Sequence, residues 1–390
     1  MKINLLNFRK STLFTLYILG FIFAFSSAIP AYTNSSFLKS ITNEKIVGVI
    51  YSVGSILSLI ALVSIPKFLK KFGNYKVTLF FTVLNFLNFL CLAFLPNIYL
   101  VLFCFIISGA MSTIIYFNLD VFIEHNSLDK KTGGIRSVYL TCINLAWLVS
   151  PWIAGIIVNE FFYRRIYFVV ALIMIPIILI VSKNLKNFKD PKYKTFNLIE
   201  TIKGIRLEKN IKNIIFSSFL LQFFYACMVV YTPIYLNQYI GFDWKTIGII
   251  FSIMLLPFIF IEIPMGYLAD KKFGEKEILT IGFIIMAIST AMIPLISNNN
   301  VVVWMIILFI TRIGAAMVEV MNDTYFFKNV SDKNLNVINL YRTVTPVAYI
   351  IAPAVTTILM FFMPLGSMFY ILGLFMIFGL RYSLAIKDTK

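Results

Sequence analysis

The chain has 390 residues, of which 60% are hydrophobic and 13% are charged, and its formal net charge is +17. A soluble domain needs more polar surface than this composition supplies, so most of the surface must face lipid. The basic residues lie between apolar runs and do not form one patch or stripe, which argues against a nucleic-acid partner.

Twelve apolar runs are long enough to cross a bilayer, which takes roughly 20 helical residues. They cover residues 12–32, 45–66, 76–95, 98–123, 137–158, 166–182, 213–236, 245–268, 277–296, 301–324, 337–362 and 365–384. The predicted fold class is therefore an all-α membrane protein with twelve transmembrane helices. The first run is too long for the apolar core of a typical signal peptide, so we expect it to stay uncleaved.

The loops between these runs predict the orientation. With the N-terminus in the cytoplasm, the basic loops 67–76, 130–136 and 271–276 all lie on the inner side, as the positive-inside rule requires. We therefore expect a multi-pass protein of the cytoplasmic membrane with both termini in the cytoplasm.

One long polar connection, residues 183–212, separates six runs from six. It is rich in Lys and Arg and contains Asp190-Pro191 as a helix breaker. We predict an N-terminal six-helix bundle (1–182), a basic cytoplasmic linker (183–212) and a C-terminal six-helix bundle (213–390).

Short sequence matches indicate that the two halves are repeats. Lys70-Lys71-Phe72-Gly73 recurs as Lys271-Lys272-Phe273-Gly274, Gly109-Ala110 as Gly314-Ala315, and Tyr139, Thr141 and Pro151 as Tyr341, Thr343 and Pro353. All offsets are close to half the chain length. A duplicated six-helix unit predicts two pseudo-symmetric bundles facing a central cavity, with alternating access by rocking of one bundle against the other.

The stretch Gly266-Tyr267-Leu268-Ala269-Asp270-Lys271-Lys272-Phe273-Gly274-Glu275-Lys276 resembles the major facilitator superfamily signature G-x-x-x-D-[RK]-x-G-[RK]-[RK], with one extra residue before the second glycine. The resemblance implies that this loop is a conformational latch. The earlier copy keeps Gly73 but lacks the first glycine and the aspartate. From the residues themselves, we expect Gly266 to permit close helix approach, Gly274 to form a tight turn, and Arg136 to be the partner of Asp270.

A second resemblance concerns the direction of transport. Ser150-Pro151-Trp152-Ile153-Ala154-Gly155 partly resembles a glycine-rich, Gly-Pro motif typical of antiporters in the fifth helix. It favours export over uptake.

Ionisable residues at membrane depth are functional candidates because they are costly to bury there. They are Asp120, Glu262, Arg312, Glu319, Asp323 and Arg342. Helical spacing places Arg312, Glu319 and Asp323 on one face of the tenth run. The carboxylates Glu319, Glu262 and Asp323 are the candidates for proton coupling.

Arg312 is a candidate anchor for an anionic or polar substrate, or alternatively a structural partner of a carboxylate. The family resemblance implies that the first, fourth, seventh and tenth helices line the cavity, which adds Asn118, Gln222 and Tyr225 as substrate contacts. For Glu262, Asp323 and Arg342 we also consider an inner gate.

The sequence gives little support for a metal site or for enzymatic activity. The four cysteines, Cys91, Cys104, Cys142 and Cys227, lie in apolar runs without CxxC spacing, and His125 is the only histidine. We expect no metal, no cofactor and no enzymatic activity, since there is also no clustered nucleophile and base and no phosphate-binding glycine loop.

We therefore predict a monomeric secondary transporter that moves a small organic solute, driven by protons, with sodium as an alternative coupling ion. Export is favoured, and uptake of a sugar or organic acid is the alternative. A membrane receptor or scaffold with a transporter fold is the alternative from another functional class.

Overall fold

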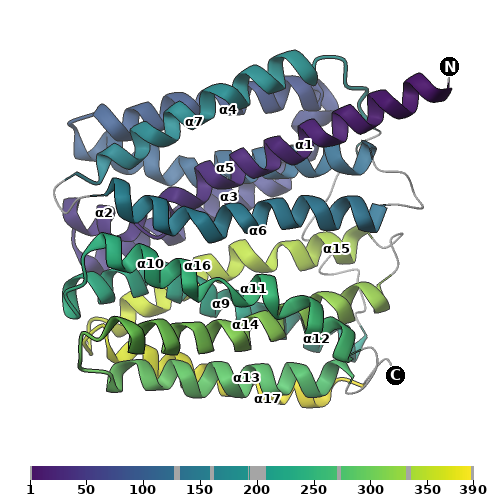
Figure 1. The fold of residues 1–390 in the computed structure, drawn as a ribbon. Helices are drawn as coiled ribbons and strands as arrows, with labels where there is room; N and C mark the ends of the chain where they lie inside the picture. Colours follow the sequence, from purple (N-terminus) through teal and green to yellow (C-terminus); the bar gives the residue numbers. More distant parts are fainter. Residues whose placement is uncertain are drawn as a thin grey trace. The chain divides into compact units, whose positions relative to one another are not determined.

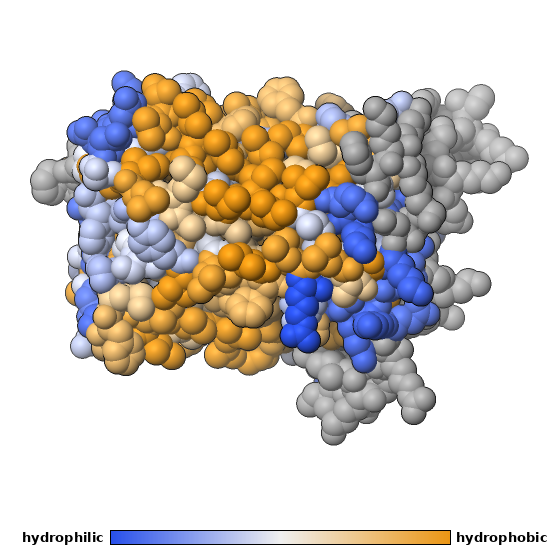
Figure 2. Space-filling view, turned by 90° about the horizontal axis from the view of Figure 1, so that it is seen from below, coloured by the Kyte–Doolittle hydropathy of each residue, from blue (hydrophilic) through white to orange (hydrophobic). Residues whose placement is uncertain are grey.

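The computed structural model describes the backbone of residues 2–126, 132–158, 162–191, 193, 208–269, 274–330 and 335–387. Within these ranges it also describes the side chains, except those of residues 2–11, 132–134, 136–137, 263, 335–336 and 339. Among the described residues, twelve helical segments are long and apolar enough to cross a membrane. The predicted number of spans is therefore confirmed. Figure 2 shows hydrophobic residues across the middle of one face, with hydrophilic residues gathered toward both ends.

The chain divides into two compact units. The first comprises residues 1–33 and 53–195. Its helices are α1 (Lys2–Ala31), most of α3 (Glu44–Phe72), α4 (Asn74–Phe94), α5 (Ile98–Asn126), α6 (Thr132–Ile157) and α7 (Arg164–Asn184). Within this unit α1 packs against α6 and α7, and α4 packs against α5 and α7 (Figure 1).

The second unit comprises residues 34–52 and 196–390. Its elements are α2 (Asn34–Ile41), the start of α3, α9 (Lys209–Ile234), the π-helix η1 (Tyr235–Tyr239), α10 (Trp244–Met254), α11 (Pro257–Phe260), α12 (Glu262–Leu268), α13 (Glu275–Met292), the 3-10 helix η3 (Ile293–Leu295), α14 (Val301–Asn329), α15 (Leu335–Arg342), α16 (Val344–Leu359) and α17 (Ser367–Ala385). α13 packs against α14 and α17, and α9 packs against α16 (Figure 1). The domain boundaries predicted from the sequence stay a prediction.

Two spans of the second unit are discontinuous. The eighth is divided into α10, α11 and α12, and the eleventh into α15 and α16. Proline explains the breaks, because it has no amide hydrogen to donate to the residue four positions earlier and its ring crowds that carbonyl. Pro257 begins α11, Pro264 follows the start of α12, and Pro346 leaves the carbonyl of Arg342 without its helical partner.

The two units repeat the same local structures, each within itself. Gly73 directly precedes α4 with φ 81°, and Gly274 directly precedes α13 with φ 85°, so both glycines adopt the left-handed region that favours glycine. Residues 270–273 lie outside the described residues, so the tight turn predicted at Gly274 stays a prediction. Near the ends of α5 and α14, Asn126 and Asn329 each donate a side-chain hydrogen bond of 2.8 Å to the carbonyl four residues earlier.

The beginning of the predicted linker packs against the first unit. We call residues 188–191 and 193 the linker strap. The Phe188 ring contacts the ring of Phe122 on α5, with centroids 4.5 Å apart. Tyr193 packs against the apolar cluster that includes Ile65 and Leu69 of α3. The strap therefore connects α3 and α5 within this unit.

Asp190 of the linker strap caps α4. Its Oδ1 accepts hydrogen bonds from the backbone amide of Asn74, at 2.7 Å, and from the hydroxyl of Tyr193, at 2.5 Å. A Cβ at Gly73 would lie 2.6 Å from the other carboxylate oxygen. Glycine therefore leaves room for the carboxylate at a helix end where negative charge is favourable. Burial, followed by the hydrogen bond to Asp190, raises the pKa of the Tyr193 phenol above its ordinary value.

A buried polar stripe runs along α4. Thr78, Thr82, Asn85 and Asn88 recur every three or four residues and are buried. Each threonine hydroxyl donates to a carbonyl of its own helix, at 2.7 Å. Within the described residues, the side-chain amides of Asn85 and Asn88 have no hydrogen-bond partner. The stripe is buried within the first unit, where α4 packs against α5 and α7.

Candidate functional site

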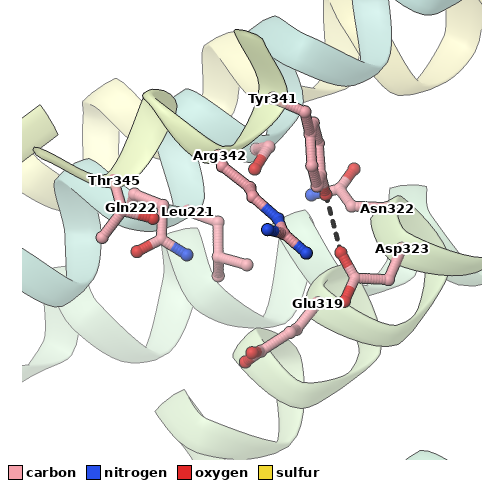
Figure 3. Close-up of a pocket in the computed structure, with 9 residues that line it drawn as sticks. Leu221, Gln222, Glu319, Asn322, Asp323, Tyr341, Arg342 and Thr345 are labelled. Atoms are coloured by element: carbon pink, nitrogen blue, oxygen red, sulfur yellow. Dashed lines mark hydrogen bonds between the residues drawn. The ribbon is translucent and has the colours of Figure 1, made fainter. Parts of the chain in front are cut away.

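A polar pocket of about 220 Å³ lies inside the second unit, among α9, α14 and the break between α15 and α16. It is lined by Ser218, Leu221, Gln222, Glu319, Asn322, Asp323, Tyr341, Arg342 and Thr345 (Figure 3). Leu221 is the single aliphatic side chain in this lining. The pocket therefore suits polar and charged groups.

Helical periodicity places these side chains. On α9, Ser218, Leu221 and Gln222 are three or four residues apart and share one face. On α14, Glu319, Asn322 and Asp323 follow the same spacing. Tyr341 and Arg342 end α15, where the proline-induced break interrupts the helix. Discontinuous helices are a recurrent way to build binding sites at membrane depth.

Both carboxylates of the pocket accept a hydrogen bond from a tyrosine. The Tyr225 hydroxyl on α9 donates to Oε2 of Glu319, at 2.6 Å. The Tyr341 hydroxyl donates to Oδ1 of Asp323, at 2.8 Å, as the dashed line in Figure 3 shows. A tyrosine donor stabilises a carboxylate without neutralising its charge, so both groups keep the capacity to bind a cation or a proton.

Arg312 lies deeper than the pocket. Its side chain is 1% exposed. The guanidinium carbon is 5.2 Å from the ring centroid of Phe224 and 5.5 Å from that of Tyr225, both on α9. Such cation–π contacts stabilise a buried cation, and here they also support the ring that donates to Glu319.

The alternative role for Arg312 as partner of a carboxylate stays a prediction. The described ion pairs do not include it, and its Nε and Nη1 have no hydrogen-bond partner among the described residues. It does interact electrostatically with Glu319, from which it is separated by seven residues, about two helical turns.

Arg342 and Glu262 add charge to the region. In Figure 3 the Arg342 side chain extends from α15 toward the space between Gln222 and Asp323. No ion pair within the described part of the chain involves Arg342. Glu262 begins α12 and interacts electrostatically with Glu319 and Asp323, although it does not line the pocket.

The other predicted site residues lie elsewhere. Asn118 is buried in the first unit, where its carbonyl accepts from the Asn74 side chain, at 3.0 Å. Asp270 and Lys271 lie outside the described residues, as does the side chain of Arg136, so the proposed latch stays a prediction. The expected close approach at Gly266 is not found, because a Cβ there would meet Val320 at an ordinary 4.0 Å.

Several pocket residues were not predicted as site residues. They are Ser218, Leu221, Asn322, Tyr341 and Thr345. Ser218 precedes Gln222 by four residues, and Asn322 follows Glu319 by three, so extending the faces already selected on those helices identifies both. Among the described residues, no group of three or more His, Cys, Asp and Glu side chains could hold a metal ion.

Comparison with known proteins agrees with this architecture. The family model of the Major Facilitator Superfamily matches residues 16–333 and, in a second match, 214–388. No protein of curated function matches the chain by sequence. A crystal structure of a mutant of the nucleoside transporter NupG is similar with a TM-score of 0.76 and 12% identity, over 96% of this chain and 99% of that one.

A second solved structure has the same fold. It is a POT family transporter in complex with a thioalcohol-conjugated peptide, with a TM-score of 0.77 and 15% identity, over 95% of this chain and 94% of that one. The fold is therefore that of a polytopic α-helical membrane transporter built from two pseudo-symmetric bundles. The chain belongs to the Major Facilitator Superfamily.

Proposed function

We propose that this protein is a secondary active transporter that couples the movement of a small polar solute to protons by alternating access, with Glu319 as the proton carrier. The observation that carries the proposal is the environment of Glu319. Its carboxylate lines the pocket and accepts one hydrogen bond from Tyr225. No ion pair of the described residues involves it.

This arrangement suits a group that changes its protonation state. A carboxylate held in an ion pair leaves a buried, uncompensated cation when it is protonated, which is strongly unfavourable. Glu319 interacts electrostatically with the buried Arg312 but is not held by it in an ion pair of the described residues, and a neutral carboxyl group keeps an oxygen that accepts from Tyr225. Glu262 and Asp323, which interact with it electrostatically, are the alternative carriers.

Export is the proposed direction, supported by the partial likeness of residues 150–155 to an antiporter motif. Uptake is the second candidate, and the polar lining of the pocket favours it because amphipathic drugs usually bind in more apolar sites. The two similar structures concern a nucleoside transporter and a POT family transporter in complex with a thioalcohol-conjugated peptide.

Proteoliposomes that contain a pH-sensitive dye test the proposal. Pools of sugars, organic acids, amines and amino acids are added to wild type and to Glu319→Gln, with Asp243→Asn as a control that alters an exposed carboxylate outside the membrane spans. We expect a solute-dependent proton flux in wild type and the control that Glu319→Gln abolishes. Its sign relative to the solute gradient distinguishes antiport from symport.

Other results would redirect the assignment. If proton flux persists in Glu319→Gln, the proton carrier is Glu262 or Asp323. If the flux depends on sodium, sodium is the coupling ion. Folded protein that binds a solute but shows no flux from any pool supports a receptor or scaffold.

A further inference from the structure

The pocket holds charges of both signs. Glu319 contributes a carboxylate from α14, and Arg342 contributes a guanidinium from the end of α15. None of the ion pairs in the described ranges joins these two groups, although both line the same cavity (Figure 3). A ligand that carries both signs would therefore complement both groups at once.

Tyr225 leaves part of Glu319 available. It donates to Oε2 of Glu319, so the other oxygen of that carboxylate, Oε1, has no tyrosine donor. An ammonium group has three donors and no acceptor, which matches an acidic oxygen already fixed in place by a neighbouring hydroxyl. The Arg342 guanidinium presents paired N–H donors, which match a carboxylate in a bidentate manner.

The size and lining of the pocket restrict the ligand further. The volume, about 220 Å³, lies below the range of roughly 300–1,000 Å³ that is usual for drug-sized ligands. Leu221 supplies the only aliphatic contact, whereas Ser218, Gln222 and Thr345 supply neutral polar groups. A large hydrophobic compound would leave these polar groups desolvated without partners, at a substantial cost.

We propose that the substrate is a small zwitterion of the amino-acid type, whose ammonium group binds Glu319 and whose carboxylate binds Arg342. This inference rests on the proposed function, since it names the substrate class of the same pocket. A purely cationic solute would leave Arg342 without a counter-charge, and a purely anionic one would bring negative charge beside the Glu319 carboxylate without offering it a donor. Asp323 and Tyr341 lie beside the site as positioning residues.

Arg312 supports the arrangement without touching the ligand. It does not line the pocket, but its guanidinium lies over the ring of Tyr225, whose hydroxyl orients Glu319. Its Nε and Nη1 have no hydrogen-bond partners among the described residues, so ring contacts with Phe224 and Tyr225 help to hold it against α9. We assign it a positioning role.

Binding to the full-length protein in detergent tests the proposal by ligand-induced thermal stabilisation. The probes are pooled standard amino acids and dipeptides, with sugars, amines and organic acids as comparison pools. The best zwitterion is then compared with its carboxamide, which is cationic, and its N-acetyl derivative, which is anionic. We expect each derivative to bind at least about tenfold more weakly, as the loss of one charge-assisted hydrogen bond predicts.

Variants make the two assignments separately testable. Glu319→Gln should lose the preference for the zwitterion over its N-acetyl derivative, and Arg342→Gln should lose the preference over its carboxamide. Arg381→Gln, on the exposed surface of α17, is the matched control and should bind like wild type. Should either pocket variant misfold, the derivative series on wild type still decides the question.

Opposite results overturn the inference. Stabilisation by sugars, amines or organic acids and not by zwitterions, equal binding of all three derivatives, or no binding from any pool would each exclude a zwitterion site. Proton flux driven by an uncharged solute would leave the proposed transport function standing while this substrate class fails. If zwitterion binding instead changes in Glu319→Gln and Arg342→Gln as expected but no flux is seen, the substrate class stands and the proposed transport function fails.

Discussion

Replacing Asp190 with alanine removes two hydrogen bonds at the N-terminus of α4, one from the Asn74 amide and one from the Tyr193 hydroxyl. Losing an N-cap costs about 0.5–2 kcal/mol, and losing a hydrogen bond typically costs about 0.5–1.5 kcal/mol. Asp190 is exposed, so we take the lower part of both ranges and expect a total of about 1–1.5 kcal/mol. At 1.36 kcal/mol per factor of ten, local opening becomes about 5- to 12-fold more frequent.

Hydrogen exchange of the Asn74 amide measures this opening directly, because that amide is the donor. We expect the exchange rate of the first turn of α4 to rise by about 5- to 12-fold in Asp190→Ala. In Asp190→Asn it should remain close to wild type, since asparagine keeps the acceptor oxygen and is an equally good N-cap.

The chain supplies a matched control in Asp243, which caps α10 by accepting from the Thr246 amide, at 2.9 Å. Asp243→Ala should accelerate exchange at the start of α10 and leave α4 unchanged. Unchanged exchange at Asn74 in Asp190→Ala, or equal acceleration there by Asp243→Ala, would refute the capping argument.

Two further predictions concern packing and pH. Gly314→Ala should lower the melting temperature of the detergent-solubilised protein. The new Cβ would lie 2.6 Å from the carbonyl oxygen of Gly282 on α13, and overpacking of this kind costs about 1–3 kcal/mol. Gly266→Ala, whose Cβ would meet its nearest neighbour at 4.0 Å, should melt like wild type, and equal melting of both variants would contradict the packing argument. Hydrogen bonds from the side chain and backbone of Thr246 lower the pKa of Asp243 in the folded protein. The stabilisation that Asp243 provides is therefore fully present above its unfolded pKa of about 4, and it is lost as the pH falls through the lower folded pKa. The difference in melting temperature between wild type and Asp243→Ala should therefore be constant above about pH 5 and shrink on acidification below pH 4, and a difference that grows there would contradict the sign.

Hydropathy predicted the spans because each must satisfy its own backbone in lipid, which makes a long apolar run almost equivalent to a helix. The positive φ of Gly274 was predictable for a similar reason, since the freedom to adopt it is a local property of glycine. The breaks in the eighth and eleventh spans were not predicted, although Pro257 and Pro346 lie beside them. Proline is tolerated in membrane helices, and only neighbouring contacts decide whether it kinks or divides one.

For the candidate site too, some features could be predicted from the sequence and others could not. Membrane-depth charge identified Glu319, Arg312 and Arg342, because burial cost depends on residue type alone. Pairing depends on distances between helices, which the sequence does not contain. The bond from Tyr225 to Glu319 joins residues 94 positions apart, and the cap that Asp190 provides joins residues 116 positions apart. Neither has a local pattern that reveals it.

The polar stripe on α4 has a consequence for biogenesis. α4 leaves the ribosome before both α5 and α7, the helices against which it packs in the first unit. Until then the amides of Asn85 and Asn88 would face lipid, where an unsatisfied polar group costs several kcal/mol. Stable integration of α4 therefore depends on chain that has not yet been synthesised. The first unit must assemble as a group of helices, with α4 retained beside the translocation machinery or water until its partners arrive.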